Sequence, residues 1–372
     1  MKKTGTVIVG AGLAGLYAAY LLEKRGIEDI VLLEARETLG GRIASTSPDR
    51  PAFPEAEMAG VDLGPSWFWP GFQHQMAELV HVLGLEAFAQ FEQGDMLVER
   101  SPAMAAQRVQ GFVNTPPSMR LKGGMQALTQ TLSQSLETTR VLLSHPVDAL
   151  HLEASHVDVY SQDAQGERLI LQAEQVLLAI PPRLAAKLSF SPALPAVLSS
   201  QWKNTPTWMA PHAKYVALFD TPFWRDQGLS GEARSLSGPL GEIHDASMPD
   251  GKAALFGFFN TPAATRERMG SDVLIQACRD QLVRLFGSQA ADPDHDIIKD
   301  WAYEPYTTTQ DDRQASAGQH PTAPANKLDN GDWSGYLIGI GSEWGQQFPG
   351  YLAGAVEAAE AGVSALFETM SR

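Results

Sequence analysis

The stretch that decides the fold lies close to the start of the sequence, and it reads Thr6-Val7-Ile8-Val9-Gly10-Ala11-Gly12-Leu13-Ala14-Gly15. Its first four residues are β-branched, which is typical of a buried parallel strand, and a helical pattern follows as far as Lys24. A strand, a glycine turn and a helix in this order predict a βα unit that binds a dinucleotide at the turn.

Each glycine of the turn has its own expected task. Gly10 would let the chain turn sharply, and Gly12 would let the backbone approach a diphosphate. Gly15 would let the helix lie close on the strand. The diphosphate would then lie at a helix N-terminus, whose unpaired N–H groups and dipole favour an anion. The expected contacts come from Gly10, Ala11, Gly12, Leu13, Ala14 and Gly15.

A second predicted strand, 30–33, ends at Glu34, about 20 residues beyond the glycine turn. A carboxylate at this place can accept hydrogen bonds from the ribose hydroxyls, and it disfavours a 2′-phosphate. The three elements together predict nucleotide binding, but they do not choose between NAD and FAD.

The next residues favour FAD. Glu34-Ala35-Arg36 leads into Leu39-Gly40-Gly41-Arg42, which resembles the second fingerprint of the glutathione-reductase-like FAD proteins, particularly the flavin-containing amine oxidase superfamily. In that superfamily the Gly40-Gly41-Arg42 turn would approach the FAD diphosphate. The alternative is a plain Gly-Gly turn with a surface arginine. The resemblance implies an α/β fold, with a Rossmann-like FAD-binding domain and a smaller substrate domain built on a mixed sheet.

The resemblance continues in blocks along the chain. The segment 61–67 is similar to the family segment beside the flavin ring, and it brings Gly64, Pro65, Ser66 and Trp67 to the cofactor. A core tryptophan after a turn is the alternative for Trp67. Residues 121–125 resemble the return of the chain to the FAD domain, and Val147 matches a strand whose backbone contacts the adenine end.

Lys214 is the first catalytic candidate. The stretch 210–219 aligns with the family strand that carries a flavin-facing lysine, which in the family holds a water against flavin N5 and assists the reaction with oxygen. A charged lysine is costly to bury among apolar residues, so we expect it to be partly neutral, bridged by water or exposed at a sheet edge. A solvated lysine on an edge strand, without a catalytic role, is the alternative.

The last forty residues match the C-terminal signature of the family in two blocks, 339–343 and 349–358. A helix N-terminus directed at the flavin there would stabilise negative charge on the reduced ring. The implied FAD contacts are Gly341, Ser342, Glu343, Gly350, Tyr351, Leu352 and Ala353. Tyr351 is also the second catalytic candidate, because it occupies the position of one of two family tyrosines that flank the amine.

One block departs from the family. Aligned by Trp301 and Tyr306, the segment 300–311 puts Gln310-Asp311 where the second cage tyrosine belongs. The paired-aromatic cage is therefore incomplete, and the candidates for its missing wall are Tyr306, Trp344 and Phe348. Gln310 also replaces the cysteine that tethers the flavin in animal monoamine oxidases, which predicts non-covalent FAD.

The chain length suggests two domains. Following the family, segments of about 1-74, 121-200 and 328-372 would build the FAD-binding domain, and 75-120 and 201-327 would build the substrate domain. The first substrate segment is shorter than in the animal enzymes, so the pocket should have fewer walls. The polar stretch 309–332 is expected to be a loop that could act as a lid.

Composition excludes other classes of protein. A net charge of −15 without a basic run argues against a nucleic-acid or anionic-membrane partner. Cys278 is the only cysteine, which excludes an internal disulfide and a cysteine metal site and suits a reducing cytosol. No apolar run approaches about 20 residues. We expect a soluble cytoplasmic protein that can form a homodimer and binds no metal.

The resemblance implies an FAD-dependent oxidoreductase acting on an amine. Hydride would pass to flavin N5, oxygen would reoxidise the flavin, and the products would be an imine or aldehyde, ammonia and hydrogen peroxide. One alternative is an FAD-dependent dehydrogenase or desaturase with an acceptor other than oxygen. Another is a flavoprotein accessory or maturation factor without an amine substrate of its own, because fold does not fix function.

Overall fold

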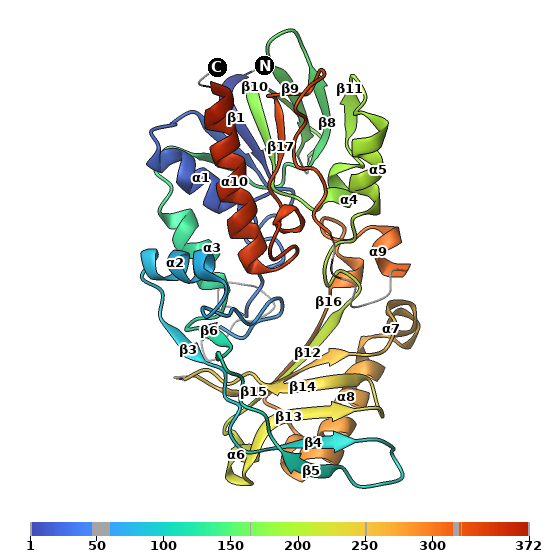
Figure 1. The fold of residues 1–372 in the computed structure, drawn as a ribbon. Helices are drawn as coiled ribbons and strands as arrows, with labels where there is room; N and C mark the ends of the chain where they lie inside the picture. The colour runs from blue at the N-terminus through green and yellow to red at the C-terminus, as the bar shows by residue number, and fades with distance from the viewer. Residues whose placement is uncertain are drawn as a thin grey trace.

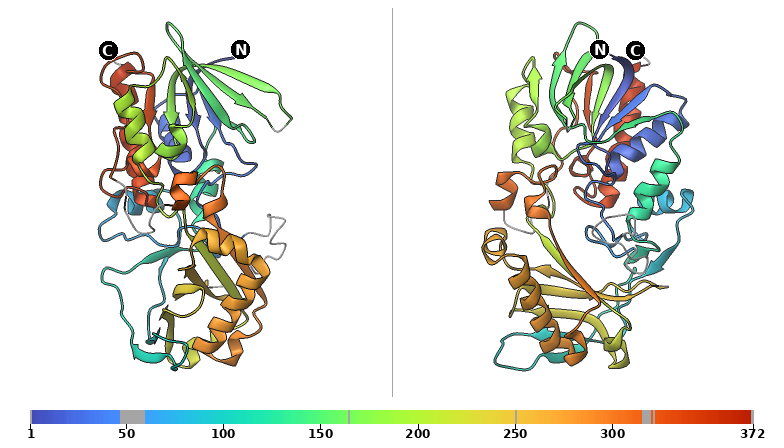
Figure 2. Two further views of the ribbon diagram at one scale, coloured as in Figure 1. Left: turned by 90° about the vertical axis from the view of Figure 1, so that its right-hand side faces the viewer. Right: turned by 180° about the vertical axis from the view of Figure 1, so that it is seen from behind.

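The computed structural model describes residues 2–46, 60–163, 165–249, 251–314, 320 and 322–370. The molecule is elongated, with one large β-sheet in each half (Figure 1). The first and last parts of the chain lie together in the upper half of that view, and the turned views in Figure 2 show the same separation of the two sheets.

The first sheet has the strand order β11-β8-β9-β10-β1-β2-β7, and β17 pairs with β10. Its strands are β1 (Lys2–Val9), β2 (Ile30–Leu33), β7 (Arg140–Leu142), β8 (Val147–Leu152), β9 (Val157–Gln162), β10 (Arg168–Leu178), β11 (Ser189–Ser191) and β17 (Leu337–Gly339). In the parallel register Val9 lies opposite both Leu33 and Leu178. The carboxyl ends of β1, β2 and β10 therefore meet at one edge, where α/β sheets bind ligands.

Helices cover both faces of this sheet. On one face α1 (Leu13–Lys24) and α10 (Leu352–Met370) lie side by side, with α2 (His74–Val82) and α3 (Gln126–Gln134) beside them (Figure 1). Leu16, Leu128 and Val356 belong to the apolar core that joins α1, α3 and α10. On the other face lie α4 (Pro182–Ala185) and α5 (Ala196–Asn204), whose Trp202 is fully buried.

The second sheet has the order β16-β12-β15-β14-β13-β4-β5. Its strands are β4 (Asp95–Glu99), β5 (Gln107–Gln110), β12 (Ala213–Phe219), β13 (Leu229–Ser235), β14 (Leu240–Asp245), β15 (Ala253–Phe259) and β16 (His295–Asp300). The remaining strands and α-helices are β3 (Ala87–Ala89), β6 (Met119–Leu121), α6 (Phe223–Asp226), α7 (Ala263–Met269), α8 (Ser271–Phe286) and α9 (Gln310–Gln314).

Strand β12 shows which way its side chains point. Ala213, Tyr215 and Ala217 join Cys278 of α8 in one core, whereas Val216 and Leu218 belong to the core on the opposite face. Because side chains alternate along a strand, Lys214 lies on the face away from α8. That second core also contains residues 61 and 63, so this face of the sheet meets the segment that precedes Ser66.

Most of the predicted elements are confirmed, with two corrections. Lys214 does not lie on an edge strand, because β12 is paired with β15 on one side and β16 on the other, and the side chain is 2% exposed. The stretch 309–332 is not wholly a loop, because it contains α9. Residues 315–319 and 321 of that stretch lie outside the described residues.

We keep the division into FAD-binding and substrate-binding segments as a proposal, with two adjustments. Helix α2 packs through Met76 and Leu79 into the core of α1 and α10, and α5 packs through Trp202 against the first sheet. Both helices therefore go with the first half of the molecule, although the sequence-based boundaries divide α5 and assign α2 to the substrate segments. None of the described helices is long and apolar enough to cross a membrane.

Candidate active site

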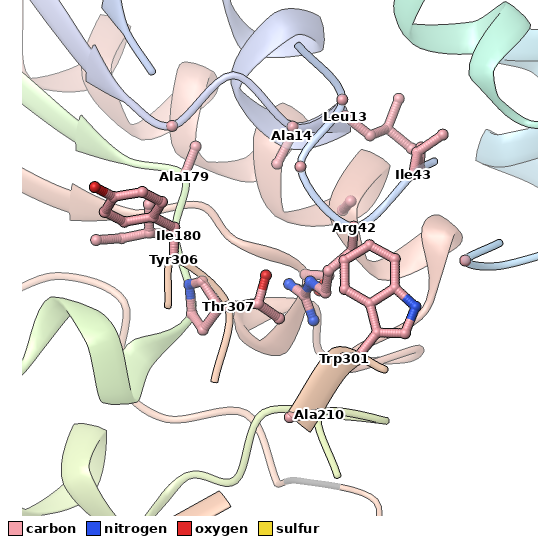
Figure 3. A pocket seen from close by; sticks show the side chains of 18 of the residues that line it. Leu13, Ala14, Arg42, Ile43, Ala179, Ile180, Ala210, Trp301, Tyr306 and Thr307 are labelled. Atoms are coloured by element: carbon pink, nitrogen blue, oxygen red, sulfur yellow. Dashed lines mark hydrogen bonds between the residues drawn. The ribbon is translucent and has the colours of Figure 1, made fainter. Parts of the chain in front are cut away.

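A cavity of about 600 Å³ opens at the carboxyl edge of the first sheet and extends to β12 of the second. Its walls come from both glycine turns, the end of β2, the segment 63–69, the start of β12 and the start of α10. Figure 3 shows Leu13 and Ile43 on the right of this pocket, and Ile180 and Tyr306 on the left. The volume suits a cofactor or a drug-sized ligand.

The two glycine turns form one end of the cavity. Gly12 and Gly40 pair as an isolated parallel bridge, and the Gly40 amide donates to the Ala11 carbonyl at 2.9 Å. A Cβ on Gly15 would lie 1.9 Å from the Gly10 carbonyl oxygen, so helix α1 can approach the strand only with glycine there. A Cβ on Gly12 would meet nothing closer than 3.8 Å. The backbone at Gly12 is thus open to a ligand beside the N-terminus of α1.

Glu34 is buried at the end of β2 and lines the cavity. Its carboxylate accepts hydrogen bonds from the Ala11 amide at 2.8 Å and the Arg36 amide at 3.0 Å. These bonds leave further lone pairs on both oxygens, which can accept from hydroxyl donors. The Arg36 side chain lies 5.6 Å from the centroid of the Tyr306 ring and donates to Thr307, so residues 306–307 close this end of the site.

Arg42 joins the second glycine turn to the C-terminal segment. Its guanidinium donates to both carboxylate oxygens of Glu343, at 2.5 and 3.0 Å, and to the Ser342 hydroxyl at 2.9 Å. Glu343 is fully buried and also accepts from the Trp208 amide at 3.3 Å. A bidentate pair of this kind fixes geometry as well as charge. The turn at 40–42, the segment 342–343 that precedes α10 and Trp208 are therefore held in one arrangement.

Aromatic rings form the wall around Tyr351. The Tyr351 ring lies 6.0 Å from Trp208 and 6.2 Å from Trp69 between centroids, and all three residues line the cavity. Gly350 makes this possible, because a Cβ there would lie 2.4 Å from Trp208 Cβ and because its φ of +86° is unfavourable for other residues. The Tyr351 hydroxyl lies 3.2 Å from Nε2 of His320. Burial raises the pKa of Tyr351, so the phenol stays protonated at neutral pH.

Lys214 is held by three oxygen atoms. Its Nζ donates to the carbonyl of Gly64 at 2.7 Å, the carbonyl of Asp62 at 3.0 Å and the hydroxyl of Ser66 at 2.9 Å. The ring of Phe256 lies 4.2 Å from the same nitrogen. These contacts tie β12 to the segment 62–66, so the position of Lys214 and the position of that segment depend on each other.

Burial lowers the pKa of Lys214 to about 7, with the nearby Asp62 carboxylate opposing this shift and Arg120 adding to it. Burial also raises the pKa of Asp62, whose Oδ1 accepts from Ser45 and from the Met125 amide, both at 2.7 Å. The expectation of a partly neutral lysine thus agrees with the environment that the structure shows.

Most of the sequence-predicted site residues line this one cavity. They are Gly10, Gly12, Leu13, Ala14, Glu34, Ala35, Arg36, Gly40, Gly41, Arg42, Gly64, Pro65, Ser66, Trp67, Val147, Lys214, Ser342, Gly350, Tyr351 and Leu352. Five lie behind the wall: Ala11, Gly15, Gly341, Glu343 and Ala353. Gly15 and Gly341 are packing positions, since a Cβ on either would overlap a backbone oxygen.

The candidates for the missing cage wall do not lie in the cage. Tyr306 lies over Arg36, Trp344 is buried against Trp202 with 5.5 Å between ring centroids, and Phe348 packs on Phe72. Gln310 is exposed in α9 rather than directed at the cavity. The rings beside Tyr351 are Trp208, Trp69 and His320, and His320 is stacked on it with 5.2 Å between centroids. They were not singled out from the sequence, because none falls on a recognised motif position.

A second cavity, of about 420 Å³, adjoins the first, and Trp67 and Trp69 line both. The indole nitrogen of Trp67 donates to Gln90 at 2.8 Å, and that of Trp69 donates to Ser118 at 2.9 Å. Hydrogen bonds therefore fix the two rings that the cavities share.

Comparison with known families decides the family of the chain. A sequence model of the flavin containing amine oxidoreductases matches residues 90–366. The chain belongs to this family. A model of an NAD(P)-binding Rossmann-like domain also matches residues 8–83, which contain both glycine turns.

Relatives agree with this assignment over most of the chain. A probable flavin-containing monoamine oxidase A of Dictyostelium discoideum is 23% identical, over 94% of each chain. Putrescine oxidase of Kocuria rosea is 24% identical, over 71% of this chain and 76% of its own. A solved structure of cyclohexylamine oxidase from Brevibacterium oxydans IH-35A has a TM-score of 0.80 at 20% identity and covers 99% of this chain and all of its own. That likeness shows the shared fold.

The family assignment makes this chain an FAD-dependent oxidoreductase, and the cavity fits the cofactor. Two glycine turns open toward it at the N-terminus of α1, where a diphosphate is favoured. Glu34 offers carboxylate oxygens at the end of β2, and α10 begins at the opposite end. Val147 and Tyr351 line the same cavity as these groups, so the lining is suited to an elongated dinucleotide.

Proposed function

We propose that this protein oxidises an amine with oxygen, using non-covalently bound FAD. The observation that carries the proposal is a single cavity in which the dinucleotide turns, the aromatic rings around Tyr351 and the buried Lys214 come together. When bound, FAD supplies the redox chemistry: it takes a hydride equivalent from the carbon next to the amine nitrogen and passes the electrons to oxygen, which becomes hydrogen peroxide. The oxidised amine is an imine, which water hydrolyses to an aldehyde and ammonia.

In this proposal the residues of the chain bind and orient FAD and the amine. The turns at 10–15 and 40–42 would hold the diphosphate of FAD, Glu34 would hold the ribose, and residues near Val147 would hold the adenine end. Residues 350–353, at and just before the N-terminus of α10, would stabilise negative charge on a reduced flavin ring bound beside them. In this scheme Lys214 assists the reaction with oxygen, and Tyr351 orients the amine.

Non-covalent binding is supported by the position of the one cysteine. Cys278 is on α8, where its side chain is fully buried in the core against the second sheet, and it does not line the cavity. Gln310, which stands where animal monoamine oxidases have their tethering cysteine, is exposed in α9. Denaturation of the protein should therefore release intact FAD into the supernatant.

An amine is supported as the substrate by the rings of Trp208, Trp69 and Tyr351, since aromatic faces attract an ammonium group and pack on its alkyl chain. Putrescine and cyclohexylamine oxidases share the fold. A small or medium aliphatic amine is consistent with both observations.

The test is to supply purified protein with a panel of aliphatic amines, diamines and amino acids, and to measure oxygen consumption, peroxide and ammonia together. The expected result is equimolar peroxide and ammonia with at least one amine. Turnover only with an artificial dye would instead support a dehydrogenase, and no turnover with any acceptor would support an accessory flavoprotein.

A further inference from the structure

One of the three hydrogen bonds of Lys214 can run in either direction. Two of the three acceptors around Nζ, the carbonyls of Asp62 and Gly64, can only accept. The third, the hydroxyl of Ser66 at 2.9 Å, can either accept or donate. The charge of Lys214 therefore decides the direction of the bond to Ser66.

Counting donors gives the two states. A charged ammonium has three N–H groups, which satisfy both carbonyls and the oxygen of Ser66. A neutral amine has two N–H groups and one lone pair, so the carbonyls keep their bonds and the Ser66 O–H must donate to the lone pair. Both states are fully bonded, and neither leaves a hydrogen of Lys214 free to reach into the cavity.

Lys214 and Ser66 both line the cavity, and Ser66 is the hydroxyl that can exchange a proton with Lys214. Among the described residues, the Ser66 hydroxyl has no hydrogen-bond partner other than Lys214. When Lys214 is charged, the O–H of Ser66 is free to donate to a molecule in the cavity. When Lys214 is neutral, a lone pair of Ser66 is free to accept from that molecule.

We propose that the Ser66 hydroxyl is a proton relay between Lys214 and the molecule that reacts in the cavity. A proton leaves the cavity molecule for Ser66 Oγ, while the hydroxyl proton of Ser66 moves to Lys214 Nζ; the reverse transfer returns it. No electrons change hands in this step. The inference rests on the proposed function, because it gives Lys214 its route to the reaction with oxygen.

The surroundings of Lys214 suit a group that changes charge. Phe256 and Phe258 cover the nitrogen from β15, at 4.2 and 5.4 Å from their ring centroids. The neighbouring charges oppose each other, since Asp62 favours the ammonium and Arg120 disfavours it. Lys299 lies opposite Lys214 on β16, but its ammonium is paired with Glu304. The pKa of Lys214, lowered by burial to about 7, lets both charge states form near neutral pH.

The experiment compares Ser66→Thr with Ser66→Val, which have nearly the same shape and differ in the hydroxyl. Ser66→Ala removes the hydroxyl without adding a larger side chain. Lys214→Met removes the group that exchanges the proton, so it shows the effect of losing the relay completely. Ser161→Ala is the control. Ser161 carries a buried hydroxyl without a hydrogen-bond partner in the described structure, on β9 away from the cavity. For each protein, the absorbance of bound FAD and the rate of its reaction with oxygen are measured from pH 5.5 to 9.5.

In the wild-type and Ser66→Thr proteins, both readouts should titrate with a pKa near 7. In Ser66→Val and Ser66→Ala, the FAD absorbance should report a pKa of Lys214 that differs from the wild-type value by about one unit, because Lys214 loses a hydrogen-bond partner. The oxygen rate of these two variants should fall roughly tenfold or more and lose its inflection. Ser161→Ala should match the wild type.

Equal pH profiles for Ser66→Thr and Ser66→Val would overturn the relay while leaving the proposed function intact. Wild-type oxygen reactivity in Lys214→Met would remove Lys214, and the relay with it, from the reaction. If no amine reduces the wild-type FAD at all, the proposed function and the relay both fail.

Discussion

The two ends of the cavity are built in different ways. At the nucleotide end, the walls are backbone turns at the edge of one sheet, and at Gly10, Gly15 and Gly40 there is too little space for a side chain. At the amine end, the walls are large side chains brought together from three distant segments, around Trp69, Trp208 and Tyr351. The first end is fixed by local geometry, whereas the second is fixed by tertiary packing and can vary without changing the fold.

Gly15→Ala should have the largest effect, because it attacks the nucleotide end directly. The new Cβ would lie 1.9 Å from the Gly10 carbonyl oxygen, so α1 or the glycine turn must shift. We expect FAD affinity to fall on the order of 100-fold or more, measured by fluorescence titration of the apoprotein. Gly26→Asn is the control, since a Cβ there meets nothing within 4 Å and Asn tolerates a positive φ. Wild-type affinity in Gly15→Ala would mean that the tight helix–strand approach is not needed.

The pH dependence of stability tests the junction of the two ends, at Lys214. Below pH 7 the lysine is protonated in both states, so the folded protein bears the full cost of the buried charge. Between about 7 and 10.5 the folded state loses the proton before the unfolded state does, so stability should rise with pH, by up to about 5 kcal/mol.

This rise is measured by chemical unfolding of the wild type and of Lys214→Met at pH 7, 8.5 and 10. The methionine has no titrating group, so the difference between the two proteins should change in favour of the wild type as pH increases. Parallel curves for the two proteins would show that Lys214 keeps an ordinary pKa in the folded state.

Much of the nucleotide end could be predicted from the sequence, because spacing alone sets it. The order of strand, Gly10, Gly12, Gly15 and Glu34 places all four residues at one sheet edge whatever the rest of the chain does. The amine end could not be predicted in the same way. Trp208 precedes β12 and belongs to no motif, and it becomes part of the wall only because Glu343 holds its amide and Gly350 leaves room for its side chain.

The environment of Lys214 could be predicted from the sequence only in part. The apolar residues around Lys214 indicated that a buried charge would be costly there, but they left a partly neutral, a water-bridged and an exposed lysine all open; the structure places the lysine in a buried position. Strand β12 is internal because it pairs with β16, which lies about 80 residues further along the chain. Strand order of this kind is a long-range property, so the reading of an edge lysine could be rejected only with the structure.

Glu34→Ala should give an intermediate effect at the nucleotide end. The change removes the acceptor of the Ala11 and Arg36 amides as well as the expected ribose contact. FAD should bind more weakly by about 1–3 kcal/mol, measured by isothermal titration of the apoprotein. The exposed Glu153, changed to Ala, is the matched control. An unchanged dissociation constant in Glu34→Ala would contradict the placement of the ribose.

Trp208→Ala should give the smallest of these effects, and it should be confined to the amine end. Loss of one aromatic wall should raise KM for amines roughly tenfold while leaving the dissociation constant of FAD unchanged. Trp208→Phe, which keeps an aromatic face, should recover part of the affinity. If amine affinity is unchanged in Trp208→Ala, Trp208 does not contribute to the amine-binding wall, which leaves Trp69 and His320 as the rings beside Tyr351.

The central claim is most directly tested by mixing the purified yellow protein with single amines in an anaerobic stopped-flow instrument and then admitting oxygen. The account predicts that at least one amine bleaches the absorbance of oxidised FAD and that the colour returns in oxygen with release of one peroxide per flavin. Absence of bleaching with every amine would contradict an amine oxidase, and bleaching without recovery in oxygen would contradict oxygen as the acceptor.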